Sequence, residues 1–85
     1  MVMDNNTRAE RVGDILIAAR DLYQMSDNDM KINQLKRIER LCYQIGEYNL
    51  SNSISYQTEL WKANKTNVNA GAICTFLYKM LLQER

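Results

Sequence analysis

Apolar residues recur at helical spacing in three stretches of this chain, and clusters of polar residues separate the stretches. In the first stretch, Thr7 and Glu10 have the spacing of a capping box, in which two side chains bond the free N–H groups at the start of a helix. The apolar residues between Ala9 and Tyr23 then fall on one stripe. This pattern predicts a helix over about residues 8–24, followed by a turn in the polar cluster 26–29.

The second stretch predicts a helix over about residues 27–49 with two different faces. Its outward face is basic, because Lys and Arg at positions 31, 36, 37 and 40 have only Glu39 among them. This face has two open interpretations, a solvated helix exterior or a site that captures phosphate. The inward stripe is expected to hold Met30, Leu35, Ile38, Cys42, Ile45 and Tyr48.

The third stretch follows a segment rich in serine and asparagine. Side chains of this kind compete for backbone hydrogen bonds, so a turn is expected near residues 50–54. Apolar residues from Tyr56 to Leu81 then predict one long helix over residues 55–83. The alternative is a break in the polar middle of this stretch, with Thr66 as the N-cap of a separate last helix. Because no Gly or Pro precedes Thr66, the single helix is favoured.

These elements predict an all-α fold, made of an N-terminal helix and a long antiparallel helical hairpin, in a single domain over residues 1–85. A chain of 85 residues buries only about 60% of the surface that its unfolded form exposes. Although 46% of the residues are hydrophobic, the core of such a chain is thin. We therefore expect a homo-oligomer, in which copies cover one another's apolar surface.

Composition argues against an enzyme. The chain contains no histidine, so neither cysteine has the usual base that would activate it as a nucleophile. Its three glycines lie far apart, at positions 13, 46 and 71, and cannot form a glycine-rich phosphate loop. We expect no catalytic residues, no metal site and no cofactor, and a binding protein is the leading class.

Charge and cysteine usage restrict the partners and the compartment. The 11 basic and 10 acidic residues nearly cancel, which argues against binding to duplex DNA but leaves room for a small anionic ligand. No stretch approaches the ~20 apolar residues of a membrane span, so no membrane partner is expected. Cys42 and Cys74 both fall on apolar stripes, which is typical of buried cysteines in a reducing compartment. The expected location is the cytoplasm.

Aromatic residues with polar edges are the best candidates for binding, since five tyrosines and one tryptophan accompany a single phenylalanine. Tyr23, at the end of the first predicted helix, either closes the core or reaches a ligand or a neighbouring subunit. Trp61 is followed within three turns by several hydrogen-bond donors, Lys65, Thr66, Asn67 and Asn69.

The segment Trp61-x-Ala63-x-Lys65-Thr66-Asn67-Val68-Asn69-Ala70-Gly71, with the helix that precedes it, resembles the helical hairpin of small phage anti-CBASS proteins over roughly residues 22–83. The resemblance implies a compact oligomer that sequesters cyclic di- or trinucleotides between protomers, in the cytoplasm of the phage host. It also implies that Lys65 and Thr66 contact phosphates, that Arg37 adds a second charged contact, and that Asn69 belongs to the site.

The same resemblance implies a base-stacking role for Tyr23, and a close helix approach at Gly71, which has no side chain. Two hypotheses follow from the sequence. The first is a non-enzymatic sponge for cyclic oligonucleotide immune signals. The alternative is a helical protein-interaction module, such as a phage-encoded inhibitor or a secretion chaperone, that docks on a protein partner through an apolar helix face.

Overall fold

The computed structural model describes residues 5–64 and 67–83, and this part of the chain is helical, without a strand. The prediction of an all-α fold is therefore confirmed. The four α-helices are α1 (Asn5–Asp21), α2 (Asn28–Gln44), α3 (Tyr48–Asn64) and α4 (Ala70–Tyr78). A 3-10 turn, η1 (Leu22–Gln24), extends α1, and a π-helical turn, η2 (Lys79–Gln83), extends α4.

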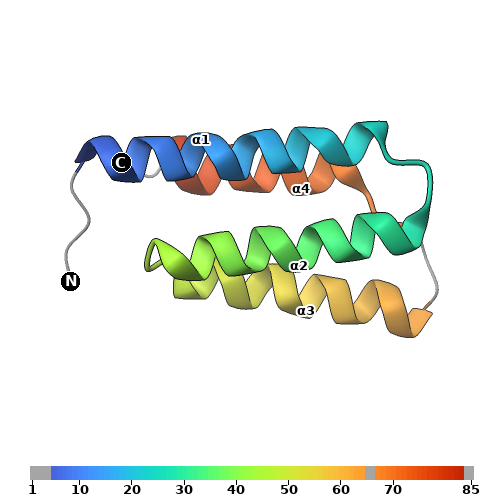
Figure 1. Cartoon of the computed structure of the whole chain (residues 1–85). Helices are drawn as coiled ribbons and strands as arrows, with labels where there is room; N and C mark the ends of the chain where they lie inside the picture. Colours follow the sequence, from blue (N-terminus) through green and yellow to red (C-terminus); the bar gives the residue numbers. More distant parts are fainter. Residues whose placement is uncertain (1–4, 65–66, 84–85) are drawn as a thin grey trace.

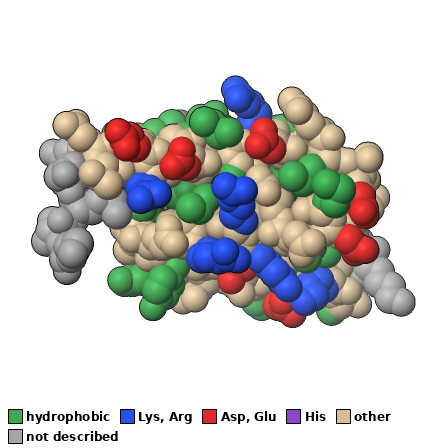
Figure 2. Space-filling view, in the orientation of Figure 1, with side chains coloured by type: hydrophobic (Ala, Val, Ile, Leu, Met, Phe, Trp, Pro, Cys, Tyr) green, Lys and Arg blue, Asp and Glu red, His purple; other side chains and the backbone are tan. Residues whose placement is uncertain are grey.

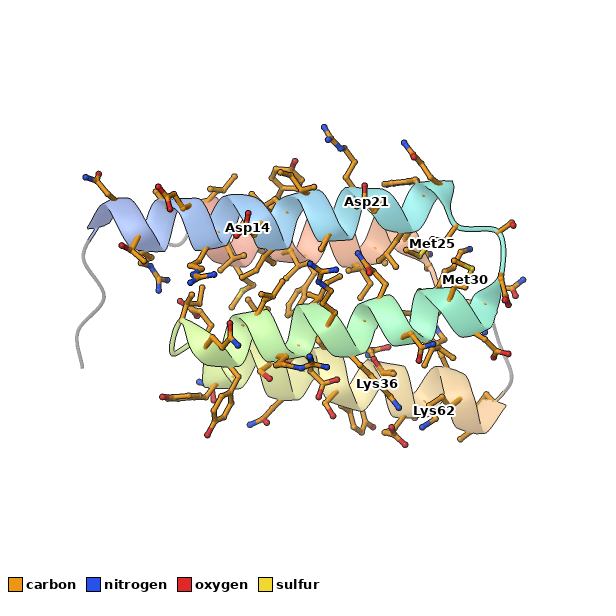
Figure 3. All side chains as sticks on the ribbon, viewed as in Figure 1. Asp14, Asp21, Met25, Met30, Lys36 and Lys62 are labelled. Atoms are coloured by element: carbon orange, nitrogen blue, oxygen red, sulfur yellow. The ribbon has the colours of Figure 1, made fainter. Side chains whose placement is uncertain are left out.

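The helices lie alongside one another in a bundle of 39 × 22 × 20 Å (Figure 1). The first helix, α1, packs against α2 and α4, whereas α3 packs against α2. Side chains fill the space between the α1–α4 pair and the α2–α3 pair, and Met25 and Met30 lie at the end where α1 joins α2 (Figure 3). One core runs through the bundle, and its fully buried large aliphatic residues are Ile15, Leu22, Leu35, Ile38, Leu50, Ile54 and Leu77.

The first helix begins earlier than the sequence predicted. In the structure α1 already includes Asn5, so Thr7 lies inside the helix and does not cap it. Arg8, one turn into α1, donates a hydrogen bond to the carbonyl oxygen of Ile45 (3.1 Å) and forms a salt bridge with Glu47 (2.5 Å). These contacts attach the start of α1 to the turn between α2 and α3.

That turn lies at residues 45–47, and the prediction of a turn near residues 50–54 was wrong. Gly46 adopts a φ of 83°, the left-handed conformation that favours glycine. The N–H of Gly46 donates to the carbonyl oxygen of Tyr43, and the N–H of Glu47 to that of Cys42, both at 3.0 Å. This is a Schellman motif, which satisfies the last carbonyls of α2 and ends the helix before the predicted residue 49.

The serine-rich segment that follows is helical because it packs on the core and forms a hydrogen bond with α2. Leu50 and Ile54 are buried in the core, and the hydroxyl of Ser51 donates to the carbonyl oxygen of Glu39 in α2 (3.0 Å). Burial and this hydrogen bond outweigh the local turn preference. Tyr48, predicted to face inward, is instead 55% exposed, and its ring meets the edge of the Tyr43 ring.

The predicted helix 55–83 is two helices, so the single long helix was wrong. The third helix ends at Asn64, and α4 starts at Ala70 with Asn69 as its N-cap, whose side chain accepts a hydrogen bond from the N–H of Ala72 (3.0 Å). Thr66, the alternative cap, lies outside the described residues. Val68 is buried and its N–H donates to the Asn28 side chain (2.9 Å), which fixes the chain between the two helices.

Candidate binding groove between α3 and α4

An open groove with a volume of about 600 Å³ separates α3 from α4. It arises because α3 packs on α2 while α4 packs on α1, so that the faces these two helices turn toward each other are left uncovered. In Figure 1, α4 lies behind α1, and α3 lies below and behind α2. The described residues that line the groove are Asn52, Ser53, Ile54, Tyr56, Gln57, Trp61, Ala72, Ile73 and Phe76.

The α3 wall of the groove carries two aromatic side chains, Tyr56 and Trp61. Asn52, Ser53, Tyr56, Gln57 and Trp61 follow one another at spacings of one, three, one and four residues, so they share one side of the helix. Tyr56 is 65% exposed, whereas Trp61 is half-buried and packs against the core. The wall therefore combines an indole ring that packs on the core with a phenol ring that is mostly exposed to solvent.

The α4 wall is short and apolar. Ala72, Ile73 and Phe76 have the same helical spacing, with Ile73 buried in the core and Phe76 half-buried. Ile73 and Ile54 form the floor of the groove, because both are almost inaccessible to solvent and both line it. A rigid aliphatic floor under partly exposed aromatic walls is suited to binding apolar groups.

None of the described residues that line the groove carries a charge. Polar side-chain groups are limited to those of Asn52, Ser53 and Gln57, the hydroxyl of Tyr56 and the indole N–H of Trp61. The groove thus offers hydrogen bonds at its rim and apolar surface below, but no group that would act as a general acid, general base or nucleophile near neutral pH.

The structure brings together two of the five binding residues that the sequence predicted. A Cβ atom built on Gly71 would lie 3.3 Å from the Tyr23 hydroxyl and 3.4 Å from the Asn69 side-chain oxygen, so both side chains flank this glycine at the start of α4. The close approach expected at Gly71 is therefore made by a tyrosine side chain. Lys65 and Thr66 lie outside the described residues.

Arg37, the remaining predicted residue, lies on the exposed side of α2. Figure 2 shows Lys and Arg side chains gathered over α2 and its border with α3, where Lys36, Arg37, Arg40 and Lys62 are exposed. This surface is mixed in charge, since Lys62 pairs with Glu59 (3.4 Å), and Glu39 and Glu59 line the cleft beside Lys36. Arg37 belongs to neither this cleft nor the surroundings of Gly71.

Tyr23 lines another cleft, of about 510 Å³, on the side of the bundle where α1 meets α4. Its ring is 62% exposed, so it does not close the core, which was one of the two interpretations of this residue. The other residues of the cleft combine a second tyrosine with two cations, and the sequence pattern did not single them out as a site: Arg20, Cys74, Thr75, Tyr78 and Lys79.

Both cysteines are free and buried. Burial raises the pKa of the Cys42 thiol from 9.0 to about 12, and the charges of Glu47 and Glu39 add to the effect. Burial also raises the pKa of Cys74, against a hydrogen bond with Tyr23 that lowers it, and its thiol donates to the carbonyl oxygen of Ala19 (3.3 Å). Both thiols are protonated at neutral pH, so neither is an activated nucleophile.

Among residues 5–64 and 67–83, no group of three His, Cys, Asp or Glu side chains is placed to hold a metal ion. No described helix is both long and apolar enough to cross a membrane. Comparison of the chain with family models, with curated proteins and with solved structures gave no match. A functional proposal therefore depends on the groove itself.

The sequence did not reveal this groove, although it drew attention to some of its residues. Trp61 and Phe76 are 15 residues apart, and in the predicted single helix they would lie about 22 Å from each other along the axis. Asn52 and Ser53 were assigned to a turn. The available signal was Asn69, a residue type that commonly caps helices and that lies between the two walls in the sequence.

Proposed function

We propose that this chain is a non-enzymatic protein-interaction module whose α3–α4 groove binds an apolar segment of a partner protein. The observation that carries the proposal is the uncharged, aromatic-lined groove of about 600 Å³. Tryptophan and tyrosine contribute more than other residues to binding energy at protein interfaces, and charged residues are depleted at interface centres. The groove has both properties.

The rim residues support the same proposal. Tyr56 leaves most of its ring in water, and Leu60, which precedes the groove residue Trp61 in α3, is 37% exposed. Covering apolar surface stabilises a complex by roughly 25 cal/mol per Å² before the entropic cost of association is subtracted. We propose that a cytoplasmic partner covers these side chains, as expected of a phage-encoded inhibitor or a secretion chaperone.

Photo-crosslinking from two matched tyrosine positions tests the proposal. A photoreactive phenylalanine derivative replaces Tyr56, which is 65% exposed at the groove, or Tyr43, which is 62% exposed on α2. In cells that naturally produce the protein, irradiation should yield a defined adduct with one protein from position 56 and none from position 43. Equal adducts from both positions, or no adduct from position 56, would contradict the proposal.

The second candidate is the sponge for cyclic di- or trinucleotides, a phage anti-defence function in the host cytoplasm. The observation that favours it is the α1–α4 cleft, in which Tyr23 and Tyr78 accompany Arg20 and Lys79. Rings of this kind stack on bases, and the two cations suit phosphates. In this candidate copies of the chain form a homo-oligomer, and the remaining contacts come from a neighbouring copy.

A thermal-shift screen with cyclic di- and trinucleotides tests this second candidate, because a ligand that binds only the folded state raises Tm. One nucleotide should raise Tm, light scattering should give a multimeric mass, and Tyr23→Leu should abolish the shift. The absence of any shift would exclude the sponge.

A further inference from the structure

We infer that the partner segment in the α3–α4 groove is an amphipathic α-helix with an uncharged apolar stripe about two and a half turns long. This inference rests on the proposed function and specifies the chemistry of the partner. It is drawn from three properties of the groove, namely the bonding state of its walls, its length and its charge.

The bonding state of the walls favours a helical partner over an extended one. Both walls are helices, in which the backbone N–H and C=O groups are already paired within the helix. The groove therefore offers only side chains, and its few polar groups all lie on the α3 wall, on Asn52, Ser53, Tyr56, Gln57 and the indole N–H of Trp61. The groove has few polar groups to bond a partner's backbone, so a segment that pairs its own N–H and C=O groups internally, as an α-helix does, fits it best.

The length of the groove sets the length of the stripe. From Asn52 to Trp61 the longer α3 wall spans nine residue steps, or about 14 Å at 1.5 Å per residue, and the α4 wall flanks about 6 Å of the groove, from Ala72 to Phe76. A second helix along this wall places two and a half turns in contact, which is about nine residues. Anchors at positions i, i+3 or i+4, and i+7 of the partner then lie on the one side that enters the groove.

The absence of charge among the described groove residues indicates which occupant fits the groove, a partner protein or a second copy of this chain. The groove walls are uncharged where described, whereas the solvent-facing sides of the two helices outside the groove carry charges. These exposed charges include Glu10, Asp14 and Arg20 on α1 and Lys36, Arg37 and Arg40 on α2. Seating either helix of a second copy would bury unpaired charges, which is costly. Two concave grooves also cannot fill each other, so the occupant is a helix from another protein.

The test uses a synthetic peptide of about 18 residues with leucines on one stripe and Ala, Glu and Lys elsewhere, labelled with a fluorophore. A matched peptide carries one proline on the polar side, which breaks the helix but keeps every leucine. Fluorescence anisotropy measures binding of each peptide to the full chain. We expect the helical peptide to bind and the proline peptide to bind at least tenfold more weakly.

Matched charge insertions then locate the binding site. Gln57→Arg places a charge on the groove wall, and Gln44→Arg makes the same change at an exposed position on α2. Both positions are exposed, so both variants should fold, and circular dichroism checks this. Gln57→Arg should weaken peptide binding at least tenfold, while Gln44→Arg should leave it unchanged.

Each contrary result overturns the inference. These results are undetectable binding of the helical peptide, equal binding of the two peptides, equal effects of the two arginine variants, or a dimer in light scattering that Gln57→Arg dissociates. The last would show that a second copy fills the groove. If the helical peptide fails to bind but position 56 still gives an adduct with a partner protein, the proposed interaction module is supported and only the helical form of the partner is rejected.

Discussion

The bundle is closed between α1 and α2 and open between α3 and α4. On the closed side Ile15 of α1 and Leu22 of η1 belong to the same core as Leu35 and Ile38 of α2, and all four are fully buried. On the open side the walls are aromatic and partly exposed, with Tyr56 65% accessible. Aliphatic packing on the closed side therefore stabilises the fold, whereas the open side leaves apolar surface partly exposed, as the proposed binding of a partner requires.

Polar contacts follow the same division. On the closed side the Gln34 amide donates to the carbonyl oxygen of Ala18 (3.1 Å), and Arg8 joins α1 to the turn after α2. No hydrogen bond between a residue of α3 and one of α4 is found among the described residues. The opening between α3 and α4 is thus bounded by two separately anchored helices, which suits a preformed binding groove.

The largest expected effect is a difference in the free energy of unfolding between substitutions on the closed side and on the open side. Leu35→Ala should lower the free energy of unfolding by about 2–5 kcal/mol, because it removes a fully buried side chain and leaves a cavity. Tyr56→Ala should change it by less than about 0.5 kcal/mol, since that ring is mostly in solvent. Urea unfolding followed by circular dichroism measures both, and comparable losses would contradict the division.

The pH dependence of the free energy of unfolding tests how well the core protects the Cys42 thiol from solvent. Its pKa of about 12 in the fold lies above the ordinary value of 9.0, so the unfolded chain loses the thiol proton first. Stability should therefore fall as pH rises from about 9 to about 12, by about 1.4 kcal/mol per pH unit for this group.

Urea midpoints at pH 8 and pH 10 check this, with Cys42→Ala as the control that lacks the titrating thiol. Other groups titrate equally in both proteins, so the difference between their pH slopes isolates Cys42. Identical slopes would show that the thiol is not protected by the core.

Residue patterns predicted the helical character of this chain and most of its core, but not where the helices end. The inward residues Leu35, Ile38 and Cys42 were identified because local periodicity is sufficient to place them on one stripe. The chain reversals depend on single residues. Gly46 ends α2 through its left-handed backbone, and Asn69 starts α4 as its N-cap, yet the low helix propensity of a single residue does not show whether a helix ends there or tolerates it.

The groove could not be predicted for a related reason. Its walls become neighbours only when the chain reverses between Asn64 and Ala70, so the error about one long helix concealed it. The predicted ligand residues were scattered in the same way, because Arg37 lies on α2 while Tyr23 and Asn69 flank Gly71. Burial of Leu50 and Ile54, a tertiary effect, likewise overrode the local turn signal of the serine-rich segment.

A smaller effect on stability is expected when glycine is replaced by alanine in the tight α2–α3 turn and at an ordinary position inside a helix. Gly46→Ala should destabilise the fold by about 1–2 kcal/mol, since φ is 83° there, although no atom lies within 4 Å of the added Cβ. Gly13→Ala, with equal free space but inside α1, should stabilise the fold by about 0.5–1 kcal/mol. Thermal unfolding gives both values, and effects of the same sign would contradict the role of Gly46.

The most direct test of the α3–α4 groove as the binding site uses Trp61, the only tryptophan in the sequence and a half-buried residue of the groove wall. Its fluorescence is recorded while the tryptophan-free amphipathic helical peptide is added to the full chain. If the groove receives the helix, the indole loses its remaining water contact, and the emission maximum shifts to shorter wavelength with the same midpoint as the anisotropy curve. An unchanged emission spectrum at saturating peptide would contradict the account, because the peptide would then bind elsewhere.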